Sequence, residues 1–162
     1  MKDFLELVKK GTPNQVQEAI EAGADLRAQD TDGWTALMCA VGNNPDPEVI
    51  TALLKAGAEI EASDRTGFTP LMAAAADNQN PEVIMTLLKA GADAKAQDNR
   101  GETPLMWAAE NNQNPEVIMT LLKAGADAKA KDSVGETAFD YAQYNENLKG
   151  TDDLKQLEEA SK

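Results

Sequence analysis

The sequence predicts an all-α solenoid, in which paired antiparallel helices stack along one axis and β-hairpin-like fingers connect the pairs. Three observations support this fold class. A 34-residue pattern recurs along the 162-residue chain. Each period carries two helix-start signals, and a polar segment without helical spacing closes it. A fixed period in this range is typical of stacked repeats, in which each unit contacts only its neighbours.

The period is clearest in two adjacent copies. Residues 64–97 and 98–131 differ at only seven of 34 positions. The same register extends along the chain through an aspartate and a glycine three residues later: Asp30 and Gly33, Asp64 and Gly67, Asp98 and Gly101, Asp132 and Gly135. We predict one domain over residues 1–162, composed of an N-terminal capping unit (1–29), three full repeats (30–63, 64–97 and 98–131) and a C-terminal capping unit (132–162).

Each period opens with a turn and a short helix. In the third unit, Asp64 to Gly67 predicts a tight turn in which glycine takes a positive φ. Thr69 and Pro70 then predict a helix start, with threonine as the N-cap and proline at the first helical position. This helix is rich in alanine, so a neighbouring helix can pack closely against it. We expect it to end near Asp77.

A second helix and a finger complete the period. Asn80, followed by proline and glutamate, predicts the helix start. The apolar residues of this helix form one stripe: Val83, Ile84, Leu87 and Leu88. Lysine and then Gly91 predict its end. The polar residues 92–101 predict an extended finger. Because no unit can bury its stripe alone, we expect stacking to form a continuous core.

The motifs of each period resemble the ankyrin repeat. In the fourth unit they are Asp98, Gly101, Thr103-Pro104-Leu105, Ala108-Ala109, Glu116-Val117-Ile118 and Leu121-Leu122-Lys123-Ala124-Gly125-Ala126-Asp127. The resemblance covers essentially the whole chain and implies a solenoid that binds protein partners. The chain departs from the family in its period of 34 rather than 33, with the extra residue between the two helices. It also has Met38, Met72 and Met106 in place of the family's histidine, and we expect packing by methionine at these positions.

The differences between the third and fourth units predict a binding surface. Counted from each aspartate, they fall at positions 2, 3, 5, 10, 13, 14 and 34. Positions 10, 13 and 14 share one face of the first helix, and most of the others lie in the adjoining turn. In the ankyrin family, finger tips and first helices form a concave groove that grips protein partners. The predicted partner-binding residues are Thr31, Asp32, Trp34, Arg65, Thr66, Phe68, Ala73, Ala76, Asp77, Asn99, Arg100, Glu102, Trp107, Glu110 and Asn111.

Two interpretations of this variation stay open. Selection for recognition explains why no difference falls in the second helix, whereas neutral drift should also have changed its exposed side. The aromatic residues Trp34, Phe68 and Trp107 are of the types that dominate protein interfaces. Their alternative role is to cover a neighbouring repeat. We favour recognition and contact with a partner.

Composition limits the class of function. Net charge is −13, from 28 acidic and 15 basic residues, which disfavours nucleic acid and anionic membranes and favours a basic protein partner. The chain has no histidine and one cysteine, Cys39, so the usual general base and a thiolate zinc site are missing. We expect Cys39 to be a small buried residue. The aspartate turns could suggest calcium, but Arg100 stands where a loop ligand should be.

We therefore predict a monomeric, non-enzymatic protein-binding module without metal or cofactor. The alternative is a designed or consensus-type scaffold with no native ligand, because near-identical repeats arise by both routes. The segment Met1–Lys10 carries acidic residues and no long apolar run, which does not fit a signal peptide. We expect a soluble protein and favour the cytoplasm, with an export signal removed before residue 1 as an open alternative.

Overall fold

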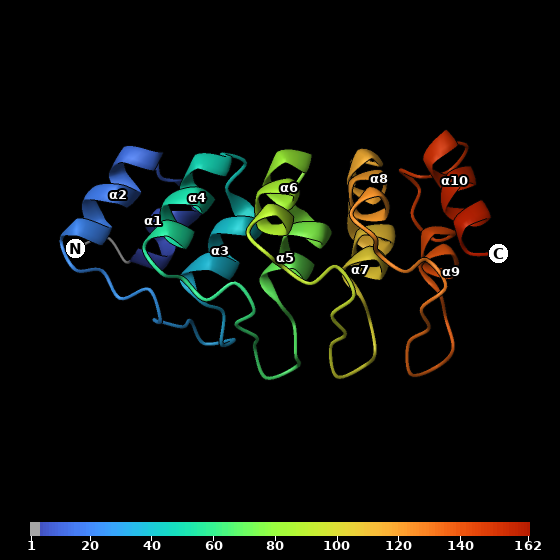
Figure 1. The fold of residues 1–162 in the computed structure, drawn as a ribbon, viewed down its shortest axis with the longest axis horizontal. Coiled ribbons are helices and arrows are strands. Elements are labelled where there is room, and N and C mark those ends of the chain that lie inside the picture. The colour runs from blue at the N-terminus through green and yellow to red at the C-terminus, as the bar shows by residue number, and fades with distance from the viewer. Residues whose placement is uncertain (1–3) are drawn as a thin grey trace.

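The computed structural model describes residues 4–162 and contains ten helices within that range (Figure 1). Residues 1–3 of the predicted N-terminal capping unit lie outside the described residues. The helices are α1 (Phe4–Lys10), α2 (Pro13–Glu21), α3 (Ala36–Asn43), α4 (Pro47–Lys55), α5 (Pro70–Asp77), α6 (Pro81–Lys89), α7 (Pro104–Asn111), α8 (Glu116–Lys123), α9 (Ala138–Ala142) and α10 (Asp152–Ala160).

The helices pair in chain order, and the pairs stand side by side in a single row from one terminus to the other (Figure 1). The first helices α1, α3, α5, α7 and α9 pack against one another in sequence, and the second helices α2, α4, α6, α8 and α10 form a parallel outer row. The predicted all-α solenoid is confirmed. We retain the five residue ranges as proposed unit boundaries, since each contains one helix pair.

Helix starts follow the signals in the sequence. Thr69 accepts a hydrogen bond from the backbone N–H of Met72, with Pro70 as the first helical residue. The side chain of Asn80 accepts from the N–H of Glu82 at the start of α6. In the N-terminal unit Thr12 forms a complete capping box with Gln15. These caps satisfy N–H groups that have no partner inside the helix.

The fingers are hairpin-shaped loops rather than strands. Residues 4–162 contain no β-strand, and their β-type pairing is limited to an isolated antiparallel bridge between Gln29 and Thr35. The aspartate at each tip organises the turn instead. In the fourth unit, Oδ1 of Asp98 accepts from the N–H groups of Arg100 and Glu102, and the N–H of Asp98 donates to the carbonyl of Glu102. Turn formation thus accounts for the recurring aspartates.

Adjacent finger tips contact each other in the C-terminal half. The backbone N–H of Asn99 donates to the carbonyl of Thr66, and the N–H of Ser133 donates to the carbonyl of Arg100, both at 2.8 Å. Gly101 lies at this contact with a φ of 78°. A Cβ on it would lie 3.1 Å from the backbone nitrogen of Ser133. Glycine is required there by both conformation and space.

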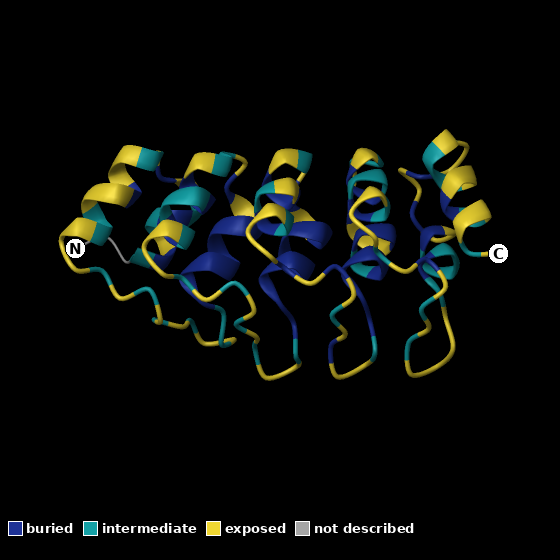
Figure 2. Cartoon of the chain, viewed as in Figure 1, coloured by how far each residue is buried: buried dark blue, intermediate teal, exposed yellow. Residues whose placement is uncertain are grey.

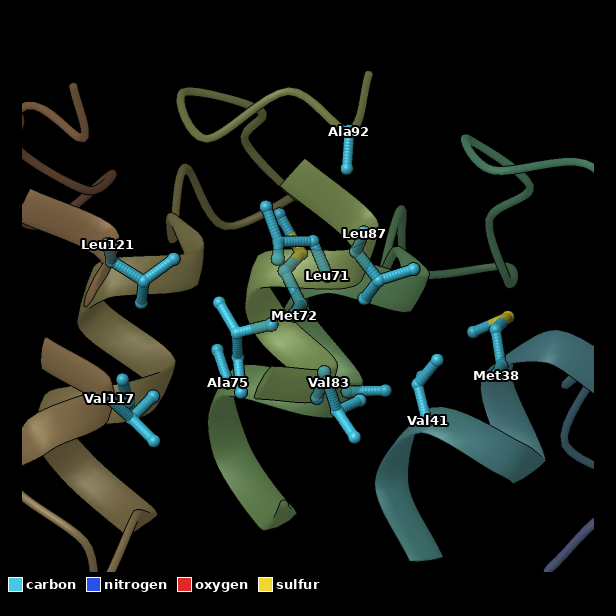
Figure 3. Packing of buried hydrophobic residues seen from close by; sticks show 14 of the residues in the cluster. Met38, Val41, Leu71, Met72, Ala75, Val83, Leu87, Ala92, Val117 and Leu121 are labelled. Atoms are coloured by element: carbon cyan, nitrogen blue, oxygen red, sulfur yellow. The ribbon is translucent and has the colours of Figure 1, made fainter. Parts of the chain in front are cut away.

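The core runs continuously through the row of helices (Figure 2). Met38 and Met72 have no exposed surface and Met106 is 1 % exposed, so methionine does pack in the place of the family's histidine. Figure 3 shows Met72, Leu71 and Leu87 within one unit, with Met38 from the preceding unit and Leu121 from the following one. The exposed colouring of Figure 2 concentrates on the fingers and on the outer side of the second helices.

A ladder of buried asparagines joins the units. Each side-chain amide follows a first helix and donates to two backbone carbonyls of the preceding unit; for Asn78 these belong to Val41 and Asn44, at 2.7 and 2.9 Å. Its Oδ1 accepts from the N–H of Asn80 in its own unit. The ladder comprises Asn44, Asn78, Asn112 and Asn145. The segment between the two helices therefore has a structural role, because it satisfies polar backbone groups at every boundary.

Candidate functional site

Three aromatic rings from successive units form a row beside the fingers. Trp34 and Phe68 are stacked, with ring centroids 5.6 Å apart and an interplanar angle of 21°. Phe68 and Trp107 meet edge to face, with centroids 4.9 Å apart. Both arrangements are favourable geometries for aromatic pairs. Phe68 is only 8 % exposed, whereas Trp34 and Trp107 are partly buried.

Trp107 also connects the first helix to its own finger. Its indole N–H donates to Oδ2 of Asp98 at 3.3 Å. Tyr141, at the same position of the last unit, donates from its hydroxyl to Oδ2 of Asp132 at 2.7 Å, and Cys39 lies with its Sγ 3.9 Å from Oδ2 of Asp30. The third unit has Ala73 at this position. The carboxylate of Asp64 therefore receives no hydrogen bond from position 10 of its own first helix.

A buried polar cluster occupies the boundary between the last two units. Glu102 is 5 % exposed; its Oε1 lies 2.9 Å from the hydroxyl of Tyr141, and its Oε2 forms an ion pair with Arg100. A phenol carries one proton, so Tyr141 donates to either Glu102 or Asp132 at one time. Burial raises the pKa of Glu102, although Tyr141 and Arg100 act in the opposite direction. Burial also raises the pKa of Tyr141 itself, and both carboxylates add to the effect.

The aromatic row borders an open hollow of about 430 Å³ on the face formed by fingers and first helices. The predicted binding residues that line it are Trp34, Thr66, Phe68, Ala76, Asp77, Arg100, Trp107 and Asn111. They come from three successive units. The hollow lies over the third unit, where Ala73 and Ala76 replace the larger Trp107 and Glu110 of the fourth unit.

The remaining predicted residues divide into two groups. Those exposed at finger tips or on α7 outside the hollow are Thr31, Asp32, Arg65, Asn99 and Glu110. Ala73 and Glu102 do not line it and are buried, at 0 and 5 % exposure. The structure therefore brings together residues from the second, third and fourth units without collecting the full predicted set in one place.

The expectation that all these side chains lie on an accessible face is wrong at four positions. Phe68, Ala73, Ala76 and Glu102 are buried, at 8, 0, 6 and 5 % exposure. Ala73 and Ala76 are buried because α5 packs between α3 and α7. Phe68 and Glu102 are buried because position 5 of one unit packs against position 10 of the next, Phe68 against Trp107 and Glu102 against Tyr141. The copies differ at these two positions where side chains meet across a boundary, so packing accounts for part of the variation.

Two residues of the hollow were not predicted from the sequence. Asp64 and Asp98 contribute to its lining, although their recurrence at every unit indicates a structural role. Burial opposes ionisation of Asp64, but hydrogen bonds from Thr66, the N–H of Phe68 and the side chain of Trp34 outweigh it and lower the pKa of this carboxyl. The tip aspartates therefore use Oδ1 to accept hydrogen bonds from the turn backbone. Their Oδ2 atom stays available to accept from other side chains, as it does in Asp98 and Asp132. The signal available in the sequence was position 10, where three units have a side chain that can donate to the tip aspartate (cysteine, tryptophan and tyrosine) and the third unit has alanine.

Asp77 differs from the other acidic residues of the hollow. Its carboxylate has no hydrogen-bond or ion-pair partner among residues 4–162. The residue is exposed, yet the walls remove enough water from the carboxylate to raise its pKa. A Cβ placed on Gly42 would lie 3.8 Å from both Oδ2 of Asp77 and the ring of Trp34. Asp77 and Trp34 thus flank the same small space.

The described part of the chain has few features that point to a reactive thiol, a metal site or a membrane span. Cys39 has no exposed surface, as expected, and burial raises the pKa of its thiol to about 11. Residues 4–162 contain no group of three or more histidine, cysteine, aspartate or glutamate side chains arranged to hold a metal ion. Within the same range, no helix combines the length and apolar character needed to cross a bilayer.

Comparisons with known proteins agree with this architecture. A family model described as ankyrin repeats in three copies matches residues 4–98 and 74–157, which together cover most of the chain. A search of curated proteins finds no match. The matched segments include the aromatic row, the asparagine ladder and the hollow. The chain therefore belongs to the ankyrin repeat family.

Proposed function

We propose that this chain is a non-enzymatic protein-binding module that holds its partner on the strip formed by the finger tips and first helices of the second to fourth units. Ankyrin repeats are generally protein–protein interaction modules. The observation that carries the proposal is the hollow, which is lined mainly by residues at which two near-identical repeats differ. Partly exposed aromatic rings beside an open groove are typical of the anchors of protein interfaces.

The chemistry of the strip supports binding rather than catalysis. The tip aspartates Asp64 and Asp98 form turns, and Glu102 is paired with Arg100 and Tyr141. The buried thiol of Cys39 and the phenol of Tyr141 are held protonated by raised pKa values. The carboxylates beside these two groups raise their pKa values further, so they favour the protonated forms rather than a nucleophilic thiolate or phenolate. The proposed partner is a protein, with a basic surface favoured by the charge of −13.

The test compares partner capture by two matched surface variants. The strip variant carries Arg65→Ala, Asp77→Ala and Asn111→Ala, all at exposed positions. The control variant carries Glu48→Ala, Glu82→Ala and Lys89→Ala, which are exposed on the outer helices. Immobilised proteins are incubated with extract of the source cells, and retained proteins are identified by mass spectrometry.

We expect wild type and the control variant to retain the same partner and the strip variant to lose it. Both variants should keep the wild-type melting temperature, because exposed substitutions change stability little. Equal retention by the strip variant would place the interface elsewhere. Retention of nothing by wild type would favour the consensus-type scaffold without a native ligand, an alternative that rests on the 34-residue near-duplication.

A further inference from the structure

The hollow has a definite shape because the third unit is locally small. Ala73 and Ala76 stand where the fourth unit has Trp107 and Glu110. The partly exposed rings of Trp34 and Trp107 border the space left open, and Phe68 packs between these two rings. A flat or elongated side chain could therefore lie over the small side chains of the third unit, with an indole ring at each border of the hollow. Neither neighbouring unit has this pair of alanines.

The same hollow carries an uncompensated negative charge. Asp77 has no partner among the described residues, and Asp64 and Asp98 also line the space. Asp64 receives no hydrogen bond from position 10 of its own first helix, where Ala73 stands, but Thr66, Phe68 and the side chain of Trp34 do donate to it. The cation in the lining is Arg100, which already pairs with Glu102. A ligand that supplied positive charge here would satisfy Asp77 and relieve the cost of its partial desolvation.

One wall of the hollow already binds a guanidinium group of this chain. The Cζ atom of Arg100 lies 5.3 Å from the ring centroid of Trp107 while its Nη2 pairs with Glu102. The combination of an aromatic face and a carboxylate suits arginine, whose planar group stacks on rings and donates to two oxygens together. On the other side of the hollow a second ring and carboxylate lie near each other: Cζ3 of Trp34 and Oδ2 of Asp77 are each 3.8 Å from a Cβ placed on Gly42, and no cation of the described residues pairs with Asp77.

We propose that the hollow between Trp34 and Trp107 receives an arginine side chain of the protein partner, with its guanidinium group paired to Asp77 and packed against the indole of Trp34. This assignment rests on the proposed protein-binding function and adds the chemistry of the partner's anchor. The partner segment is a basic one, complementary to the charge of −13 of this chain. Asp77 gives charge selectivity and the two indoles give shape selectivity.

The two tryptophans of the chain allow a direct test, because both line the hollow. Their indole N–H signals are followed by NMR while the full chain is titrated with a capped glycine–serine peptide that carries one central arginine. Matched peptides carry lysine or the neutral isostere citrulline instead. The protein variants are Asp77→Asn, which removes the charge at nearly constant shape, and Glu82→Gln on α6 as the control.

We expect the arginine peptide to shift the indole signals in a saturable, salt-sensitive manner, with the citrulline peptide about tenfold weaker and the lysine peptide about threefold weaker. Asp77→Asn should weaken arginine binding about fivefold, and Glu82→Gln should leave it unchanged. The proposal is overturned by no shift, by equal binding of citrulline, or by an unaffected Asp77→Asn variant. If partner capture still depends on the strip in that case, only the arginine assignment fails. If capture is also independent of the strip, the proposed function fails with it.

Discussion

Asn112 donates a hydrogen bond from its side-chain amide to the backbone carbonyl of Asn78, 2.9 Å away, across the boundary between the third and fourth repeats. Its second amide hydrogen bonds to the carbonyl of Ala75 at 2.7 Å. Since Asn112 is 1 % exposed, water cannot replace these bonds. Asn78 makes the same two contacts one unit earlier. The boundaries are therefore fixed by polar contacts as well as by apolar packing.

Asn112→Ala should destabilise the domain by about 2 kcal/mol, because two buried carbonyls lose their donor. Chemical denaturation followed by circular dichroism measures the change. Gln113→Ala, at the exposed neighbouring position, should stay within about 0.5 kcal/mol of wild type. Equal stability of the two variants would mean that the ladder contributes nothing to the repeat boundary.

Phe68→Ala should cost about 3 kcal/mol of unfolding free energy. The ring is 8 % exposed and contacts both Trp34 and Trp107, so its removal leaves a cavity between two units. Arg65→Ala, on the exposed tip of the same finger, provides the control and should change stability by less than about 0.5 kcal/mol. A loss below about 1 kcal/mol for Phe68→Ala would indicate that the ring does not contribute to packing between the units.

Gly42→Ala should stabilise the domain by about 0.5–1 kcal/mol. Gly42 lies inside α3, where glycine disfavours the helix, and the nearest atoms to an added Cβ are 3.8 Å away. Gly101→Ala should act in the opposite direction, since Gly101 has a φ of 78° and backbone atoms of the next finger within 3.1–3.3 Å. Thermal unfolding of both variants tests this difference in sign.

Glu102→Gln should change the pH dependence of stability. The pKa of Glu102 in the folded protein is raised above its ordinary value of 4.5 by burial, against the opposing effects of Tyr141 and Arg100. The folded state thus holds this proton more tightly than the unfolded state, and ionisation costs stability as pH rises from 4.5 through the raised value. Glutamine does not ionise. The stability of Glu102→Gln relative to wild type should therefore rise over this window.

Urea unfolding of the Glu102→Gln variant and of wild type at a series of pH values measures that difference. Glu136→Gln serves as the control, because Glu136 occupies the same position of the last unit and is exposed. A relative stability of Glu102→Gln that falls with rising pH would show that the ion pair with Arg100 and the hydrogen bond from Tyr141 outweigh burial.

The helices could be predicted from the sequence because their signals are local. Thr69 with Pro70, and Asn80 with Pro81, place helix starts at the observed residues. The asparagine ladder was missed because its partners are carbonyls 34 to 37 residues away. The available signal was the recurrence of Asn44, Asn78 and Asn112 at intervals of 34.

The candidate site was predictable in position more than in detail. Comparing the two copies identified Asp77, Asn111 and Thr66, which line the hollow as exposed side chains. The comparison could not separate exposed positions from those that pack across a boundary, such as Phe68. Both kinds vary between copies, since a side chain that faces the next unit must match a residue outside its own repeat. Only the packing of neighbouring units distinguishes them.

The most direct test of the proposed binding strip is amide hydrogen exchange on the complex with the captured partner. We predict slower exchange in the finger tips 64–68 and 98–102 and at the C-terminal ends of α5 and α7, where Asp77 and Asn111 lie. Exchange along α4, α6 and α8 should match that of the free protein. Slower exchange confined to those outer helices, with unchanged exchange in the fingers, would contradict the proposed binding strip.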